Sequence, residues 1–347
     1  MDFSLSPDQA DLRDLANRIL TDSFPAERLK EVAESDSAVD LAAWKRLGDA
    51  GLIAIGLPES VGGGGYGWLE SAIVLCEVGR AAAPVPALPV LVAAPALVGH
   101  ADLLDGVADG STVVTIATHE PLGDIYAPTT TVTDGKLSGL KTNVPFGMVA
   151  KRFVVTAADG LYSVEADADG VDVVRQDTTS GVPEAQVTFS NAPAIKLGGV
   201  AATEDLIRRA LSAAAMITTG ACQAALDLTA KYATTRHQFE RQIASFQAVS
   251  QRTGDAYIDT EAVKLSAWQA AWRLANGFEA DEALLTAKFW AAEGGWRVMH
   301  AAHHIHGGFG VDRDYPLHHY FLTHKQLELL WESATPTLVR LGKSLTA

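Results

Sequence analysis

The chain has 347 residues, of which 48% are hydrophobic and 20% are charged, so it can form two or three domains with a sizeable core. Its formal net charge of −15 argues against nucleic acid as a partner, because phosphate contacts need clusters of basic residues. A local basic pocket could still bind a small anion. No apolar run can span a bilayer, and the N-terminus lacks the basic and apolar segments of a signal peptide, which indicates a cytoplasmic protein without a membrane span.

Helices are predicted for residues 1–110. Ser6 followed by Pro7 is typical of a helix N-cap and first turn, and apolar residues then recur with the period of a helix. Two more helices are expected at 41–50 and 69–80. The glycine-rich segment between these two helices is expected to be a loop.

Residues 111–198 change to short β-branched runs separated by Gly, Asp and Pro, which is the spacing of strands. The runs lie at 112–118, 129–133, 152–156, 171–175 and 185–189. Asp134-Gly135 is a hairpin-turn signal. The pattern predicts an antiparallel barrel or sandwich.

Residues 199–347 return to long helical periodicity with few helix breakers. The expected helices are 206–235, 246–275 and 281–304, with a last one after Pro316. Cys76 and Cys222 lie in apolar helical surroundings and are expected to be buried thiols rather than a disulfide. The predicted fold is therefore mixed α and β, mainly α: a helical domain (1–110), a middle β domain (111–198) and a C-terminal four-helix bundle (199–347).

The segment that begins with Arg236 interrupts two strong helical patterns. It reads Arg-His-Gln-Phe-Glu-Arg-Gln-Ile-Ala-Ser-Phe-Gln-Ala-Val. One interpretation is a polar loop between helices with an exposed arginine. The other is an anion site, in which Arg236 supplies a fork of donors and Phe239 an apolar surface.

Four histidines lie between positions 300 and 306, before the pair Gly307-Gly308. His300 and His304 could share a helix face, but no carboxylate or cysteine accompanies them in a zinc pattern, so we expect no metal. A helix end at the glycines is the plain alternative.

These two segments, in this order and spacing, resemble those of the acyl-CoA dehydrogenases, and the resemblance covers essentially the whole chain. The matching features are Arg-x-Gln-Phe followed by Phe-Gln, the Gly-Gly-x-Gly run followed by Tyr315-Pro316, and the Pro-Glu-x-x-Gly-Gly loop at 58–63. The family has glycine at Glu240 and glutamine at His304. The resemblance implies that the chain has the acyl-CoA dehydrogenase fold. It also implies that FAD is bound partly by a neighbouring subunit. The residues implied to contact FAD are Arg236, Phe239, Phe246, Gln247, His304, Gly307 and Gly308.

The middle region matches the family less closely. The family's Thr-Glu-Pro-Gly-x-Gly-Ser-Asp is shortened here to 118–124, without the serine, and its Trp-Ile-Thr corresponds to Asn143-Val144-Pro145. The resemblance implies that His119, Val144 and Pro145 line the flavin, through backbone groups. Ordinary strand and turn is the alternative for both segments.

The catalytic base is expected to be a carboxylate that takes the substrate α-proton. The family's glutamate follows an aromatic residue, and this chain has Trp331-Glu332 before a helix end expected at Pro336. Glu332 is therefore the candidate base. A count without gaps from Tyr315 puts Trp331 at the base position instead, and a glutamate one residue away on a helix would point about 100° away.

Three functions follow from the resemblance. The first is FAD-dependent dehydrogenation of an acyl-CoA, a fatty or sterol side-chain thioester, with electrons passed to an electron-transfer flavoprotein. The second is a degenerate subunit that completes the FAD site of a related subunit in a heterotetramer. The third is a flavin-free binding or scaffold protein of the same fold. A homo- or hetero-oligomer is expected in the first two.

Overall fold

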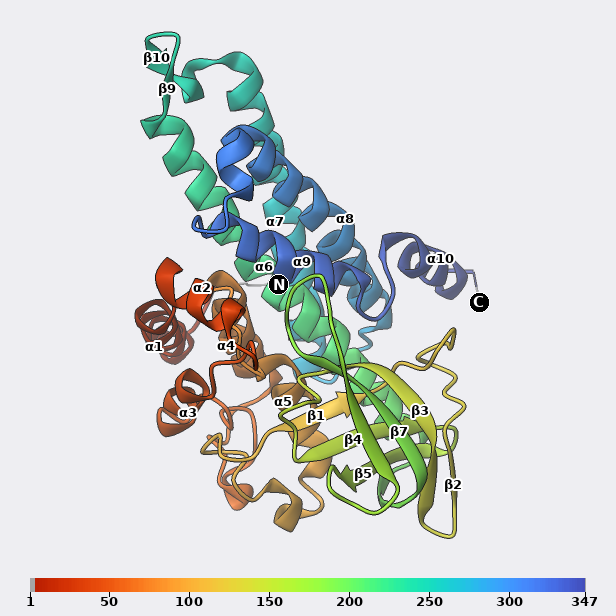
Figure 1. Ribbon diagram of the computed structural model, residues 1–347. Coiled ribbons are helices and arrows are strands. Elements are labelled where there is room, and N and C mark those ends of the chain that lie inside the picture. Colours follow the sequence, from red (N-terminus) through yellow and green to blue (C-terminus); the bar gives the residue numbers. More distant parts are fainter. Residues whose placement is uncertain (1–3, 347) are drawn as a thin grey trace. The chain divides into compact units, whose positions relative to one another are not determined.

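The computed structural model describes residues 4–346 (Figure 1). The described residues group into two compact units. Unit 1 holds residues 4–31, 72–83 and 211–346, and unit 2 holds residues 32–71 and 84–210. The three predicted domains divide the chain differently and remain a prediction. No helix within the described residues is long and apolar enough to cross a membrane.

Unit 1 is built from helices. They are α1 (Pro7–Ser23), most of α4 (Trp68–Arg80), most of α6 (Val200–Thr235), α7 (Gln247–Ala275), α8 (Asp281–His306), α9 (Leu317–Leu329) and α10 (Ala334–Ser344). The predicted helices are confirmed, and α10 is an addition to them. The Ser6 cap is also confirmed: its hydroxyl accepts from Gln9 N at 3.2 Å, and the Gln9 side chain accepts from Ser6 N at 3.0 Å.

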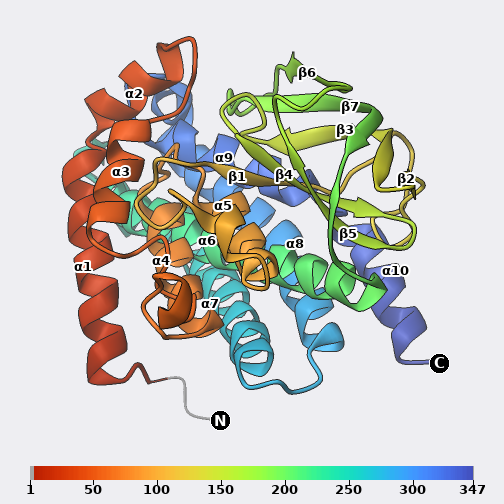
Figure 2. The ribbon, with the colours of Figure 1, turned by 90° about the horizontal axis from the view of Figure 1, so that it is seen from below.

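Helices α4 and α6 approach each other closely through two glycines. A Cβ on Gly79 would lie 1.9 Å from the Ile217 carbonyl oxygen, and one on Gly220 would lie 1.8 Å from the Cys76 carbonyl oxygen. Only glycine permits this contact between backbones. Figure 2 labels α4 and α6, which lie next to each other there.

Unit 2 contains α3 (Leu41–Asp49) and α5 (Ala87–Ala93), while α2 (Ala26–Glu34) crosses the division between the units. Helix α5 was not expected, because its apolar sequence is interrupted by prolines. The structure accommodates Pro86 before the helix and Pro89 in its first turn, where a missing N–H costs no intrahelical hydrogen bond.

The β part of unit 2 consists of two four-stranded sheets, ordered β1-β4-β5-β8 and β2-β3-β7-β6. The strands are β1 (Val114–Ala117), β2 (Thr131–Thr133), β3 (Lys136–Pro145), β4 (Arg152–Ala157), β5 (Gly160–Glu165), β6 (Val171–Gln176), β7 (Glu184–Pro193) and β8 (Ile195–Gly198). One core is shared by both sheets, with Phe153 of β4 meeting Phe189 of β7. The arrangement is a sandwich, and the sheets within the described residues do not close into a barrel.

The strands of the two sheets pair antiparallel, as the sequence predicts, with one exception, and β5 and β8 are additions to the predicted strands. The β2–β3 hairpin turns at Asp134 and Gly135, which have φ of +50° and +72°, as a type I′ turn requires. Strands β1 and β4, however, pair in parallel, whereas an antiparallel arrangement was expected. The run pattern predicts strands but not their partners, so it could not detect this crossover.

Candidate functional site

The end of α6 leads into a short hairpin before α7 begins. Its strands are β9 (His237–Gln238) and β10 (Arg241–Gln242). Phe239 and Glu240 at the tip have φ of +51° and +64°, a conformation that is uncommon for residues other than glycine. Strain of this kind is often found at functional sites.

An aromatic cluster joins the end of α6 to the end of α8. The Tyr232 ring stacks on His306 with centroids 4.3 Å apart and on Phe309 at 5.8 Å. His306 Nε2 lies 3.1 Å from the Tyr315 hydroxyl, and Arg236 N donates to Tyr232 O at 2.8 Å. The cluster therefore brings the arginine segment and the glycine run to the same end of unit 1.

Three of the side chains predicted to hold a cofactor at this end of unit 1 are exposed to solvent. Arg236 is exposed and makes no hydrogen bond or ion pair through its side chain within residues 4–346. The Phe239 side chain is 87% exposed and meets the Phe246 ring edge-on at 6.1 Å. Gln247, the first residue of α7, is exposed as well. An unpaired cation and an exposed aromatic ring on the same short segment suit a ligand that carries both a phosphate and a planar ring.

The glycine run presents bare backbone. A Cβ on Gly307 or Gly308 would meet no heavy atom within 4 Å, and Gly307 has φ of +61°. His304 is exposed beside them, whereas His306 is buried, and this burial lowers the pKa of His306 despite its hydrogen bond to Ala302 O. No group of three potential metal ligands occurs among the described residues. The absence of a metal stays a prediction.

The candidate base lies in a bend rather than on a helix. Trp331 and Glu332 have φ of +54° and +79°, between the end of α9 and the start of α10. The helix end expected at Pro336 is wrong, since Pro336 stands in the first turn of α10, where proline is well tolerated. The helical rotation argument does not apply to this pair of residues.

The Glu332 carboxylate is engaged by an arginine of the following helix. Arg340 Nη2 lies 2.6 Å from Glu332 Oε1, and Arg340 Nε lies 3.2 Å from Oε1 and 3.3 Å from Oε2. Trp331, the preceding residue, is 1% exposed. The contact directs the Glu332 carboxylate toward α10, and a general base must instead lie within hydrogen-bond reach of the proton it removes.

A buried lysine supports the same bend. Lys288 of α8 donates from Nζ to Leu327 O at 2.5 Å and to Glu328 O at 3.3 Å, so it caps the last turn of α9. Burial lowers the pKa of Lys288 to about 7, although the negative charges of Glu328 and Glu332 act to raise it.

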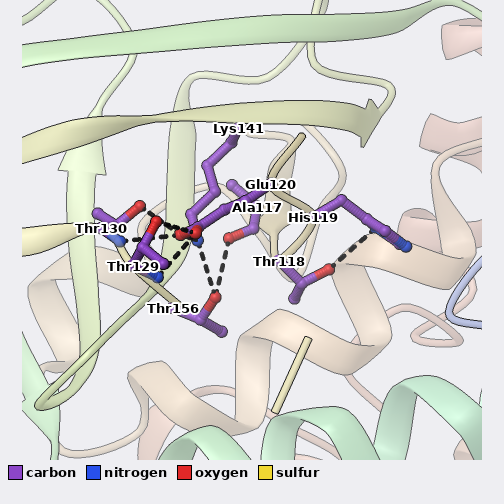
Figure 3. A network of polar contacts seen from close by, with 8 residues as sticks. All are labelled: Ala117, Thr118, His119, Glu120, Thr129, Thr130, Lys141 and Thr156. Atoms are coloured by element: carbon purple, nitrogen blue, oxygen red, sulfur yellow. Dashed lines mark hydrogen bonds and ion pairs between the residues drawn. The ribbon is translucent and has the colours of Figure 1, made fainter. Parts of the chain in front are cut away.

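In unit 2, the shortened loop after β1 is closed by a buried ion pair (Figure 3). Glu120 Oε1 lies 2.7 Å from Lys141 Nζ and accepts from Thr130 N at 2.9 Å, while Oε2 accepts from Thr129 N at 2.7 Å. Both threonine hydroxyls also donate to the carboxylate, at 2.7 and 2.5 Å, and Lys141 Nζ donates to Thr156 Oγ1 at 3.1 Å. Every polar group of the pair is satisfied inside the protein.

The electrostatics of this pair reflect its burial. The Glu120 and Lys141 side chains are 6% and 0% exposed. Burial alone would raise the pKa of Glu120, but hydrogen bonds from Lys141 and the two threonines hold it at about 2. Burial lowers the pKa of Lys141 to about 8. Both groups are charged at neutral pH, and together they fix the loop against β3.

The other flavin candidates of unit 2 lie around this loop. His119 forms an isolated β-bridge with Thr142. The next residue, Asn143, sits in a bulge of β3 with φ of +50°. Val144 is fully buried in the sandwich core, and the Pro145 carbonyl accepts from the Thr115 hydroxyl. The Val144 carbonyl likewise accepts from Gly147 N at 3.1 Å. Both carbonyls thus already have a partner in the protein, and flavin contacts through the backbone of Val144 and Pro145 stay a prediction.

Sequence reasoning did not find Lys141, Lys288 or Arg340. Each is a basic residue whose partner comes from a different element, so no local pattern identifies it. A lysine inside an apolar strand or helix pattern is the one signal available, because buried lysine is rare unless it is paired.

The chain is similar to known proteins over most of its length. Residues 6–102 match the family model "Acyl-CoA dehydrogenase, N-terminal domain", and residues 198–330 match "Acyl-CoA dehydrogenase, C-terminal domain". Among curated proteins, the chain is 36% identical to acyl-CoA dehydrogenase FadE27 of Mycobacterium tuberculosis, over 99% of both chains.

Two solved structures are similar over nearly their full length. The ChsE4-ChsE5 complex from Mycobacterium tuberculosis has a chain 35% identical, with a TM-score of 0.94, covering 100% of this chain and 99% of that one. A variant of the Tcur3481-Tcur3483 steroid ACAD has a chain 40% identical, with a TM-score of 0.93, covering 98% of each.

Proposed function

This chain belongs to the acyl-CoA dehydrogenase family, and from that premise we propose that it acts in FAD-dependent α,β-dehydrogenation of an acyl-CoA as one subunit of a heteromer. In this proposal it completes an FAD site shared with a related subunit that supplies the catalytic base. The observation that carries the proposal is the ion pair between Glu332 and Arg340.

The residues at the end of unit 1 fit FAD. Arg236 offers an unpaired guanidinium to a phosphate, and the exposed Phe239 ring offers an apolar surface to a planar ring system. Gly307 and Gly308 leave backbone that a ligand can approach without meeting a side chain. When bound, FAD would accept the hydride that leaves the substrate β-carbon.

The role of this chain's own residues is binding and orientation. Arg236 would hold negative charge, Phe246 and Gln247 would border the site from the start of α7, and His304 would lie beside the glycines. The loop closed by Glu120 and Lys141 would hold His119 in place from the middle region. None of these roles requires a proton transfer by this chain.

In this proposal Glu332 is a structural residue and not the base. Its carboxylate lies 2.6 Å from the Arg340 guanidinium, and it would have to leave this partner to come within hydrogen-bond reach of a substrate proton. The preceding residue, Trp331, is large and buried. A small residue there would leave space for a substrate beside the carboxylate, and the indole does not. The family's general-base step is therefore assigned to a glutamate of the related subunit.

The proposed substrates are bulky thioesters of the sterol side-chain class, and an electron-transfer flavoprotein is the proposed electron acceptor. Support comes from the similarity to a chain of a steroid ACAD and to a chain of a two-component complex. A site made by two different subunits can be wider than one made by identical copies, because each side can change independently.

The first experiment measures flavin content. The chain is purified alone and after co-expression with related subunits from the same genome, and the flavin spectrum is recorded for each. We expect stoichiometric flavin only in a co-expressed assembly. Full flavin occupancy and acyl-CoA turnover in the chain alone would contradict the heteromer.

The second experiment tests the base. Glu332→Gln is assayed in the active assembly, and we expect near-full kcat because the base lies elsewhere. A loss of about a hundredfold or more, with FAD and acyl-CoA binding intact, would favour the second candidate, in which this chain carries the base. The order Trp331-Glu332 is the observation that favours that candidate.

A further inference from the structure

Unit 1 contains a pocket of about 530 Å³, and none of the residues assigned to FAD lines it. Its walls come from α1, α4, α6 and α7. Gly220 of α6 contributes to it without a side chain, at the point where α6 touches the backbone of α4. The volume falls in the range of pockets that bind drug-sized molecules.

The lining combines an apolar body with several cations. Ile73 and Trp268 are among its apolar residues. Arg13 of α1, Arg80 of α4 and Lys264 of α7 supply three positive charges from three different helices. Convergence of three cations on one pocket is notable in a chain with a net charge of −15, because most of its surface would repel an anion.

Within residues 4–346, each of the three cations forms an ion pair that is at least partly exposed. Arg13 pairs with Asp14 at 2.7 Å, and Arg80 pairs with Asp227 at 2.9 Å. Lys264 pairs with Glu261 at 3.2 Å. The basic side chains are 41–47% exposed, and water screens such pairs so that each contributes little to stability. A ligand anion can therefore take one of these donors at little cost.

One acidic residue of the pocket, Glu77, would oppose the binding of an anion. Glu77 is 7% exposed and accepts from Asn17 Nδ2 at 2.7 Å. Burial raises the pKa of the Glu77 carboxyl, against the hydrogen bond from Asn17 and the charge of Arg80. An ionised Glu77 would repel a bound anion, so a neutral residue at this position should strengthen binding.

We propose that this pocket binds an amphipathic carboxylate, with the apolar body against Ile73 and Trp268 and the carboxylate among Arg13, Arg80 and Lys264. The site is separate from the FAD end of unit 1 and does not depend on the function proposed above. It gives the chain a second ligand, of the class to which free fatty or sterol acids belong.

The test is calorimetric titration of the chain, in the assembly in which it is stable, with dodecanoate and with the uncharged dodecanol. We expect saturable binding of one dodecanoate per chain, and binding of dodecanol at least about tenfold weaker, since a charge-assisted hydrogen bond contributes about 1.5–3 kcal/mol. Equal affinity for the acid and the alcohol, or no dodecanoate binding, would overturn the proposal.

Variants locate the site and separate it from non-specific adsorption. Arg80→Met and Lys264→Met should each weaken dodecanoate binding by about tenfold, whereas Glu77→Gln should strengthen it. Lys45→Met, which removes an exposed lysine of α3 in unit 2, is the control and should have no effect. Circular dichroism confirms that each variant is folded, and unchanged affinity in a folded Arg80→Met, Lys264→Met double variant would assign binding elsewhere and overturn the proposal.

Discussion

The Glu120–Lys141 region buries its charged groups, whereas the end of α6 at Arg236 exposes its charged group to solvent. Glu120 and Lys141 are buried, and protein groups satisfy each of them. Arg236 is exposed, and its side chain has no hydrogen-bond or ion-pair partner within the described part of the chain. The first arrangement holds a loop in one shape, while the second leaves donors free for something outside this chain.

The same difference appears in the backbone. The loop closed by Glu120 is held at Thr129 and Thr130 through main-chain donors as well as hydroxyls. The hairpin tip at Phe239 and Glu240 is strained and exposed. Internal hydrogen bonds stabilise one conformation of a loop. Backbone strain at an exposed tip lowers stability unless binding to a partner compensates for it. The contrast separates residues that hold this chain's own fold from the residues that we propose to bind FAD.

The largest expected effect comes from breaking the buried pair. Glu120→Gln leaves the Lys141 ammonium buried without its counter-charge, and we expect it to lower the free energy of unfolding by about 3–5 kcal/mol. Denaturant titration measures this change. The double variant Glu120→Gln, Lys141→Met should recover part of the loss, because no uncompensated charge remains.

The control for this prediction is an exposed pair of the same type. Asp49→Asn breaks the contact between Lys45 and Asp49, whose side chains are 56% and 62% exposed, and should cost less than about 1 kcal/mol. If Glu120→Gln costs no more than Asp49→Asn, the Glu120–Lys141 pair does not stabilise the loop.

A smaller effect is expected at the open end. Arg236→Ala should leave the stability of the chain nearly unchanged and reduce FAD retention by about tenfold or more, since a charge-assisted hydrogen bond contributes about 1.5–3 kcal/mol. Flavin absorbance after dilution and gel filtration of the assembly measures retention. Arg18→Ala, at an exposed position of α1, is the control, and equal retention in both variants would remove Arg236 from the site.

The smallest effect concerns strain at the hairpin tip. Glu240→Gly should raise the free energy of unfolding by up to about 1 kcal/mol, because glycine adopts positive φ without the steric penalty of a side chain. Phe239→Gly relieves similar strain but also removes the exposed ring, so it should lower FAD retention while Glu240→Gly does not. Thermal unfolding and flavin absorbance distinguish the two, and a loss of stability in Glu240→Gly would show that its side chain contributes to the fold.

Much of the fold could be predicted from sequence because its signals are local. The Ser6 cap and the turn at Asp134-Gly135 depend on residues only a few positions apart. The long helices α6, α7 and α8 follow from apolar periodicity. The arginine segment and the glycine run were likewise predicted as a pair, and the Tyr232–His306 stack brings them to one end of unit 1.

The remaining features depend on contacts that no local pattern encodes. Lys141 reaches Glu120 across 21 residues of sequence, and β1 pairs in parallel with β4. Arg340 could not be assigned to Glu332 without knowing that the chain bends there instead of continuing as a helix. The sequence by itself determined the long helices, the Ser6 cap and the Asp134-Gly135 turn, because those depend on short-range hydrogen bonding and hydrophobic period. Only the tertiary structure decided which charges are paired and which are left open, because burial and distance between elements exist only once the chain has folded.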